Sequence, residues 1–420
     1  MNRARLAAFA VMVGLAALHW PASLAARESS GTPAARAHFA EGEAAIKARD
    51  YKLAAAAFRK AIDADPDFVD AHQRFIETTK WDVMPMSRTS GVPQLQSLYE
   101  RWAKQHPKRA AYRWALGFLT DDMAKSDAFL NEALKIDPTF ARAHFLLARN
   151  ADLRGDFEAQ RRHLKAAVEI SPDSPQYLMR YAQAHKTSDA ARFRALALSV
   201  VEKFPNTPAA CEALYHLADA SSNPERRAIL ERIRSEYPAD RFNYSPSAMS
   251  ELYNDSTSPS EALSVAKDMV KWQPASKTWA QRAAHQEAMV RAETLIAERR
   301  FAEALDVLAN TQRPSGPHGT TWVLAKAEAG AGAGKLDEAY TTLVESVAAA
   351  PDDRVQTALV KYGAALDKTS QQIDADVWRI RDAKATPAAP FQLASSTDGK
   401  PTQLADYRGR VVLLAFWFPG

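Results

Sequence analysis

Apolar residues recur with a helical period through most of the chain. Between residues 36 and 380, Ala-rich amphipathic segments alternate with short turns that contain proline or glycine. Apolar residues three and four positions apart share one face of a helix, whereas strict alternation would indicate a strand. Strand-like alternation is almost absent from this region. The pattern predicts a mainly α protein built from pairs of antiparallel helices.

One helix pair is especially clear. Its first segment carries Leu147 and Ala148, a turn follows at Gly155, and the second segment carries Leu164. A small residue opposite a large one lets two helix axes approach closely, so these positions are expected to be buried. Glycine supplies the permissive backbone of the turn, and Phe157 is expected to close the contact between the two helices.

Prolines give this pattern a nearly fixed period. Proline cannot continue a helix but can begin one, so each proline marks the end of a helix pair. Successive prolines lie 33 to 36 residues apart, at Pro138, Pro172, Pro205, Pro238 and Pro274. One hairpin alone cannot bury its apolar face, so a period near 34 residues predicts a stack of hairpins.

This arrangement resembles the tetratricopeptide repeat over residues 36–380. Residues 35–68 and 320–353 show the same scheme of small, aromatic and proline positions most clearly. The resemblance implies an α-solenoid, in which we expect about eight helical hairpins. Residues 80–94 and 255–260 interrupt the rhythm and are expected to be loops between repeats.

The resemblance also implies a concave face, lined by the first helix of each hairpin, that binds proteins or peptides. The expected groove residues come from two hairpins and are Arg36, Phe39, Glu43, Arg142, Phe145, Arg149 and Asp152. Arginines in such a groove suit an acidic segment or a C-terminal carboxylate. The carboxylate clamp of the family uses Lys and Asn, which this sequence does not reproduce, and solvated helix faces are the alternative.

Composition argues against several other functions. Lys and Arg number 54 against 50 Asp and Glu, without a basic run, so we expect no nucleic-acid partner. No two of the ten histidines lie three to five residues apart, so no helical two-histidine metal site is predicted. Cys211 is the single cysteine and lies in an apolar helical pattern, which favours a buried, inert thiol. We expect neither a metal nor a cofactor.

Two motifs resemble a nucleotide-binding loop and paired catalytic carboxylates, but both favour a structural interpretation. Residues 329–336 (AGAGAGKL) approach a phosphate-binding loop, but Leu336 stands where that loop needs a hydroxyl group for magnesium. The repeat register places the stretch in a helix and the turn that follows it. The pairs Asp121–Asp122 and Asp352–Asp353 are expected to be charges at helix N-termini, because adjacent residues on a helix point apart.

The N-terminus has the features of a secretory signal. Arg3 and Arg5 precede an apolar stretch over residues 6–18, and small residues follow. A bilayer-spanning helix needs about 20 apolar residues, so this stretch is too short to be one. We therefore expect a signal peptide over residues 1–25 and a linker over 26–35. The protein is expected to be exported, either periplasmic in a Gram-negative bacterium or secreted, with no membrane span after cleavage; an uncleaved anchor is the alternative.

The sequence changes character near its C-terminal end. Residues 381–389 are small and proline-bearing and predict a linker. Phe391–Leu393 and Thr402–Leu404 predict a short hairpin around the turn residues Asp398-Gly399. Val411–Phe418 is an apolar run that predicts a central strand buried on both faces.

Residues 390–420 resemble the opening of a thioredoxin-like domain of the thiol–disulfide oxidoreductases. The matching pieces are Ala389-Pro390-Phe391, Asp398-Gly399-Lys400, Asp406-Tyr407-Arg408-Gly409 and Phe416-Trp417. In that family a redox-active cysteine follows, so we expect an incomplete α/β start that stops before its cysteine motif, poorly packed and inactive in the present chain. The whole protein would be a thiol–disulfide oxidoreductase whose repeats bind a protein partner. The alternatives are a non-enzymatic periplasmic scaffold and a peroxiredoxin-type antioxidant domain.

Overall fold

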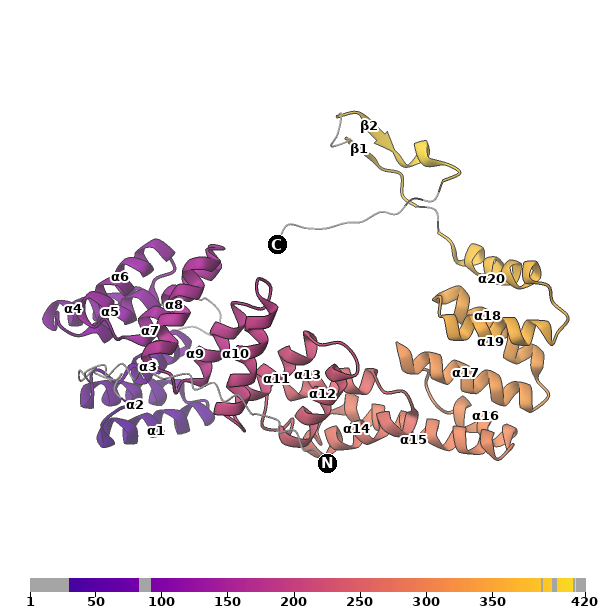
Figure 1. Cartoon of the computed structure of the whole chain (residues 1–420), viewed down its shortest axis with the longest axis horizontal. Coiled ribbons are helices and arrows are strands. Elements are labelled where there is room, and N and C mark those ends of the chain that lie inside the picture. The colour runs from indigo at the N-terminus through magenta and orange to yellow at the C-terminus, as the bar shows by residue number, and fades with distance from the viewer. Residues whose placement is uncertain (1–29, 83–91, 387, 395–398, 411, 413–420) are drawn as a thin grey trace, which may run out of the picture. The chain divides into compact units, whose positions relative to one another are not determined.

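The chain divides into two compact units, residues 1–245 and 246–420. Nearly all described residues before residue 385 are helical or lie in the short turns between helices (Figure 1). The computed structural model describes residues 30–82, 92–386, 388–394, 399–410 and 412.

The described residues of the first unit form twelve helices. They are α1 (Pro33–Lys47) with α2 (Tyr51–Ala64), α3 (Val69–Asp82) with α4 (Val92–Gln105), α5 (Ala110–Leu119) with α6 (Met123–Ile136), α7 (Ala141–Leu153) with α8 (Phe157–Ile170), α9 (Pro175–Gln183) with α10 (Ala190–Lys203), and α11 (Pro208–Asp219) with α12 (Glu225–Glu236).

Eight more helices follow, beginning at the boundary between the units. They are α13 (Ser245–Asn254), α14 (Pro259–Trp272), α15 (Lys277–Ala297), α16 (Phe301–Ala309), α17 (Pro317–Gly332), α18 (Leu336–Ala349), α19 (Asp353–Ala364) and α20 (Ser370–Lys384). The prediction was about eight hairpins, which corresponds to sixteen helices, whereas the described residues form twenty helices. Helix lengths from nine residues in α9 to 21 in α15 blur the sequence period.

Side-chain caps and prolines decide where many helices begin. Ser174 accepts a hydrogen bond from the backbone N–H of Tyr177, and Pro175 occupies the first turn of α9. Such a side chain satisfies a backbone donor that has no partner within the helix. Asp122 and Asp352 cap α6 and α19 in the same way. The prediction that the two Asp pairs serve helix N-termini is confirmed.

Close packing in the first two clear hairpins follows the predicted small and large positions. A Cβ added to Gly42 of α1 would lie 2.5 Å from Cε1 of Phe58 on α2, so the helices meet at this glycine. Leu147, Ala148 and Leu164 are buried as predicted, and Ala148 and Leu164 belong to one cluster between α7 and α8. The prediction for Phe157 was wrong: it begins α8 with 56% of its side chain exposed.

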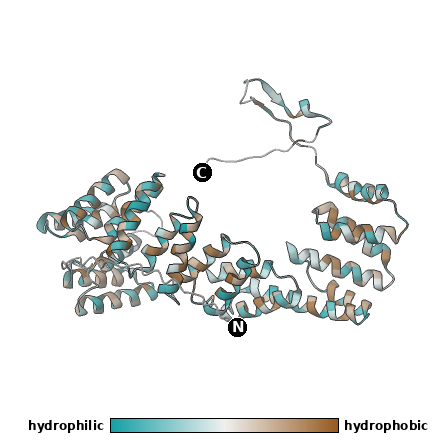
Figure 2. Cartoon of the chain, in the orientation of Figure 1, coloured by the Kyte–Doolittle hydropathy of each residue, from teal (hydrophilic) through white to brown (hydrophobic). Residues whose placement is uncertain are grey.

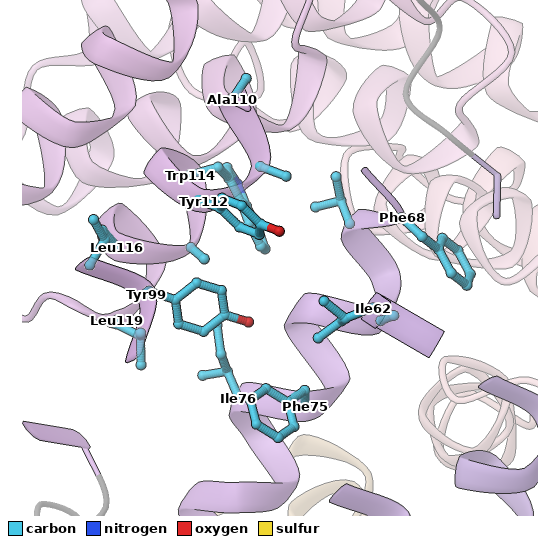
Figure 3. Packing of buried hydrophobic residues seen from close by; sticks show 14 of the residues in the cluster. Ile62, Phe68, Phe75, Ile76, Tyr99, Ala110, Tyr112, Trp114, Leu116 and Leu119 are labelled. Atoms are coloured by element: carbon cyan, nitrogen blue, oxygen red, sulfur yellow. The ribbon is translucent and has the colours of Figure 1, made fainter. Parts of the chain in front are cut away.

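Aromatic side chains dominate the core of the first unit (Figure 3). Tyr99 of α4 is fully buried and contacts Tyr112 of α5, with ring centroids 6.4 Å apart. His72 of α3 is also fully buried, with Nδ1 2.9 Å from the Tyr99 hydroxyl and Nε2 2.9 Å from the Pro66 carbonyl oxygen. Burial lowers the pKa of His72 to about 4. This histidine is therefore a neutral hydrogen-bonding group of the core near pH 7.

The second unit has its own core, centred on α17, α18 and α19. The glycine-rich stretch contributes to it as predicted: Gly330 lies inside α17, where an added Cβ would meet Ala339 at 3.4 Å. Gly334 follows in the turn with φ +80°, a backbone conformation that favours glycine. Hydrophobic and hydrophilic residues interleave along the helices of each unit, as amphipathic helices require (Figure 2).

A short hairpin follows the helices. Strands β1 (Gln392–Ala394) and β2 (Pro401–Gln403) pair antiparallel, with Leu393 opposite Thr402, and a 3₁₀ helix (Leu404–Tyr407) follows. This confirms the predicted hairpin. All but one residue of the two strands are exposed, so the described residues form no core around them. The predicted strand Val411–Phe418 lies outside the described residues except for Val412.

Several element boundaries differ from the predicted ones. Helix α1 begins at Pro33 and α20 ends at Lys384, so the helical region extends a few residues beyond 36–380 on both sides. Helix α3 continues to Asp82, within the expected loop 80–94. The predicted signal peptide lies outside the described residues. Within the described residues, none of the helices combines the length and apolarity needed to cross a membrane.

Candidate functional site

Two neighbouring cavities open along α7 in the first unit. The first has a volume of about 620 Å³, and its walls include Ala148, Asp152, Phe157 and Leu164. The second has a volume of about 440 Å³, and its walls include Asp70, Trp114, Phe118 and Arg142. Three residues line both cavities, namely Phe145, Arg149 and Gln176. We call the two cavities together the α7 groove.

The groove crosses the first helices of successive hairpins. Its walls come from α3, α5, α7 and α9, with contributions from α8. The predicted residues of α7 (Arg142, Phe145, Arg149 and Asp152) are spaced by three or four positions, which puts them on one face of that helix. All four line the groove.

The cations of the groove differ in their partners. Arg142 binds the Asp70 carboxylate and donates to Oε1 of Gln73 at 3.0 Å, which ties α7 to α3. Arg180 of α9 lies 3.3 Å from Oε1 of Glu212 on α11. Arg149 differs: among the described residues its guanidinium has no hydrogen bond and no ion pair. Burial against the groove wall lowers the pKa of Arg149.

A second donor in the groove is also without an acceptor. Trp114 of α5 is only 3% exposed, and its Nε1 has no hydrogen-bond partner in the described part of the chain. An unsatisfied buried donor costs about 1–3 kcal/mol. Trp114 and Arg149 line the same cavity. The Trp114 Nε1 itself is buried, so the cation that faces the groove without a described partner is Arg149.

Aromatic and aliphatic side chains make up the rest of the groove wall. The rings of Trp114 and Phe118 stack with centroids 5.2 Å apart and an interplanar angle of 11°. The rings of Phe145 and Tyr177 lie 5.1 Å apart. Phe157 is largely exposed at the rim, where water contacts its apolar surface. The groove thus combines an uncompensated cation with apolar surface, which suits a partner with both an acidic and an apolar group.

The family model of the tetratricopeptide repeat matches residues 35–68. The first hairpin is a tetratricopeptide repeat. The matched residues comprise α1, α2 and the turn that leads to α3, and the later helix pairs continue the same alternation.

Several solved structures are similar to parts of this chain. One is a thermophilic tetratricopeptide protein of Thermus thermophilus, at 15% identity and TM-score 0.34, over 44% of this chain and 99% of that one. Another is the MamA protein, at 18% identity and TM-score 0.28, over 40% and 93%. A third is the Cut9–Hcn1 hetero-tetramer of the APC/C, at 12% identity and TM-score 0.34, over 77% and 55%. No curated protein sequence matches the chain.

The tetratricopeptide hairpin α1–α2 carries the other three predicted groove residues. Arg36 is exposed, whereas the Phe39 ring packs 5.2 Å from the rings of both Phe58 and Phe68. Glu43 binds Nε of Arg74 on α3 at 2.7 Å. None of the three lines the α7 groove. The structure therefore does not bring the two predicted sets of residues together.

Sequence reasoning missed the polar cluster around Glu212. This carboxylate is 9% exposed and accepts hydrogen bonds from Gln183 Nε2 at 2.8 Å and the Tyr244 hydroxyl at 2.9 Å, besides its contact with Arg180. All three contacts reach Oε1, so this carboxylate joins α9, α11 and the residue before α13. In the sequence, the signal in this region was the preceding residue, the single cysteine Cys211.

Cys211 is fully buried in α11, as predicted. Burial raises the pKa of its thiol to about 12. Because the thiolate is the nucleophile, this thiol is a poor one near neutral pH.

Two histidines that lie far apart in the sequence meet between α7 and α8. Nδ1 of His144 is 3.1 Å from Nδ1 of His163, within hydrogen-bond distance. Burial lowers the pKa of both imidazoles, that of His144 to about 4. Among the described residues, no cluster of three or more His, Cys, Asp or Glu side chains is arranged to hold a metal ion.

Proposed function

We propose that the α7 groove binds a segment of a partner protein that carries a carboxylate next to an apolar side chain. The observation that carries this proposal is Arg149, a cation shared by both cavities that has no partner among the described residues. The tetratricopeptide repeat in the first hairpin supports a protein as the partner, because helical repeats expose extended surfaces that bind proteins.

The charges of the groove favour an acidic group at one place. Arg142 and Arg180 already contact Asp70 and Glu212, so a ligand carboxylate there would compete with a protein carboxylate. At Arg149 a ligand carboxylate would meet no such competition, because Arg149 makes no ion pair with a described residue. An apolar side chain of the ligand fits the wall formed by Ala148, Phe157 and Leu164. Volumes of about 440 and 620 Å³ lie in the range of ligand pockets, roughly 300–1,000 Å³.

Selection from a random peptide library on the purified chain tests the proposal. We expect selected peptides to share an acidic residue or a free C-terminal carboxylate beside an apolar residue. Arg149→Ala should weaken binding of a selected peptide by about tenfold, since a charged hydrogen bond contributes about 1.5–3 kcal/mol.

Arg162→Ala is the matched control. Arg162 is an exposed residue of α8 that does not line the groove, so its removal should leave affinity unchanged. Equal losses in the two variants, or selected peptides without an acidic group, would contradict the proposal.

We further propose that the chain is exported and that residues 390–420 begin a thioredoxin-like domain, so that the groove brings a protein substrate to thiol–disulfide exchange. The β1–β2 hairpin, which forms at the strands expected from that resemblance, supports this second proposal. Disulfide exchange requires thiols other than Cys211, whose burial and raised pKa oppose reaction.

The gene sequence beyond codon 420 tests the redox proposal. A Cys-x-x-Cys motif within a few codons supports a thiol–disulfide oxidoreductase, and a single cysteine after a longer interval supports the peroxiredoxin-type alternative. A stop codon directly after codon 420 would contradict the redox proposal and support the non-enzymatic scaffold. Export is tested by fusing residues 1–25 to an alkaline phosphatase, which is active only outside the cytoplasm; an inactive fusion would refute it.

A further inference from the structure

A third cavity lies in the second unit, well separated in sequence from the α7 groove. Its volume is about 560 Å³, and it is bounded by α15, Tyr253 of α13, and residues 310–315 between α16 and α17. One face of α15 supplies Thr278, Gln281, Arg282 and His285, spaced by three or four positions. The lining holds arginine and histidine but no aspartate or glutamate.

Arg282 is held against two aromatic rings. Its guanidinium carbon lies 4.4 Å from the ring centroid of Trp279 and 4.9 Å from that of Tyr253. Contacts with the ring faces stabilise the cation but use none of its N–H groups as hydrogen-bond donors. Among the described residues, Arg282 makes neither a hydrogen bond nor an ion pair. Its position is therefore fixed while its donors remain available.

No carboxylate belongs to the described lining of this cavity. Glu287, on the same helix, binds Lys267 at 3.1 Å. The charge of Arg282 thus has no compensating carboxylate in the cavity lining.

His285 adds a second polar group without a full set of partners. The imidazole hydrogen-bonds to the backbone of Gln312, whereas its Nε2 is buried and has no partner in the described part of the chain. Thr278 and Gln281 on the same face of α15 provide a hydroxyl and an amide. Ala284, Ala288 and Pro314 provide apolar wall beside these polar groups.

We propose that this cavity binds a small anion through an oxyanion group, either a carboxylate or a phosphate, placed on the Arg282 guanidinium. A guanidinium can donate two parallel hydrogen bonds to either group, and such charge-assisted pairs are among the strong hydrogen bonds of proteins. The remainder of the ligand lies against Ala284, Ala288 and Pro314, with a polar group near Thr278 or Gln281. This site involves other residues than the α7 groove, so it does not depend on the function proposed for the groove.

Isothermal titration of the full chain with inorganic phosphate and, separately, with succinate tests the site at low ionic strength. We expect at least one probe to bind with a one-to-one stoichiometry, and the stronger of the two identifies a phosphate or a carboxylate as the preferred group. Arg282→Gln should weaken that binding by about tenfold or more.

Arg291→Gln is the matched control, because Arg291 is exposed on α15 and does not line this cavity. It should change the affinity by less than about twofold, since one distant surface charge contributes little in screened solution. Binding of neither probe, or equal weakening by the two substitutions, would overturn the proposal.

Arg282→Lys tests whether weaker binding by Arg282→Gln reflects a folding defect. Lysine keeps the charge and much of the contact with the two rings. This variant should retain the wild-type circular dichroism spectrum and still bind the preferred probe more weakly than the wild type, since an ammonium cannot donate two parallel hydrogen bonds. Unchanged affinity in this folded variant would refute a bidentate site at Arg282.

Discussion

At the scale of single residues, the distance between two helices is set by the absence of a side chain. Gly42 of α1 faces the Phe58 ring, and an added Cβ would come within 2.5 to 2.8 Å of three ring carbons. Phe58 is fully buried and cannot move aside freely. Gly42→Ala should therefore destabilise the chain by about 1–3 kcal/mol, the usual cost of overpacking a core. The free energy of unfolding by urea measures this change.

Gly330→Ala is the control for this prediction. Gly330 also lies inside a helix, but its added Cβ would meet Ala339 at 3.4 Å, an ordinary contact distance. Alanine has the higher helix propensity, by about 1 kcal/mol, so this substitution should be neutral or stabilising. A comparable destabilisation by both substitutions would show that the contact with Phe58 is not the cause.

The site residues show what local pattern can and cannot predict. The register of α7 in its hairpin sufficed to put Arg149 on the groove face, because helical periodicity determines which residues share a face. It could not predict that Arg142 is paired and Arg149 is not, because the partner Asp70 lies 72 positions away in the sequence. Nor could it foresee that Phe39 packs against the ring of Phe68, 29 positions further along the chain.

At the scale of helices, the N-terminal caps connect one hairpin to another. Asp352 accepts hydrogen bonds from the backbone N–H groups of Arg354 and Val355, and also from the Thr320 hydroxyl of α17 at 2.8 Å. Asp352→Ala removes both the cap and the link to α17. Loss of a cap alone costs about 0.5–2 kcal/mol, so we expect a destabilisation of about 1–3 kcal/mol when the second hydrogen bond is included. Thermal unfolding measures it.

The neighbouring substitution Asp353→Ala is the control, because it removes a negative charge near the start of α19 without removing the capping hydrogen bonds. Asp353 is exposed in the first turn of α19, and its carboxylate makes no hydrogen bond or ion pair with another described residue. It interacts only with the positive end of the helix, which contributes about 0.3–1 kcal/mol. If Asp353→Ala lowered the melting temperature as much as Asp352→Ala, charge rather than capping would explain the effect.

The helices themselves were predictable where start and stop signals are strong. Ser174-Pro175 and Thr207-Pro208 combine a capping side chain with a proline in the first turn, and helices begin at both places. Helix α15 runs for 21 residues, which displaces the following elements from the repeat period. Its length depends on packing against α14, α16 and α17, which single-helix signals do not contain.

At the scale of the whole chain, burial of neutral histidines makes stability depend on pH. Burial lowers the pKa of His72, His144, His163, His285 and His318 among others. Each therefore binds a proton more readily in the unfolded chain than in the folded one. Protonation of the unfolded state should progressively destabilise the fold as the pH falls below about 6.5, the pKa of an unperturbed histidine.

His72 provides the sharpest test of this coupling, because it is fully buried and its folded-state pKa is about 4. Its contribution to stability is constant above pH 6.5 and is lost as the pH falls from about 6.5 towards 4. Between pH 7 and pH 5 the loss should reach about 2 kcal/mol from this residue alone. His72→Gln removes the titrating group, so the free energy of unfolding by urea should fall by about 2 kcal/mol less over that interval than in the wild type. An undiminished pH dependence in His72→Gln would show that His72 is not a source of the acid sensitivity.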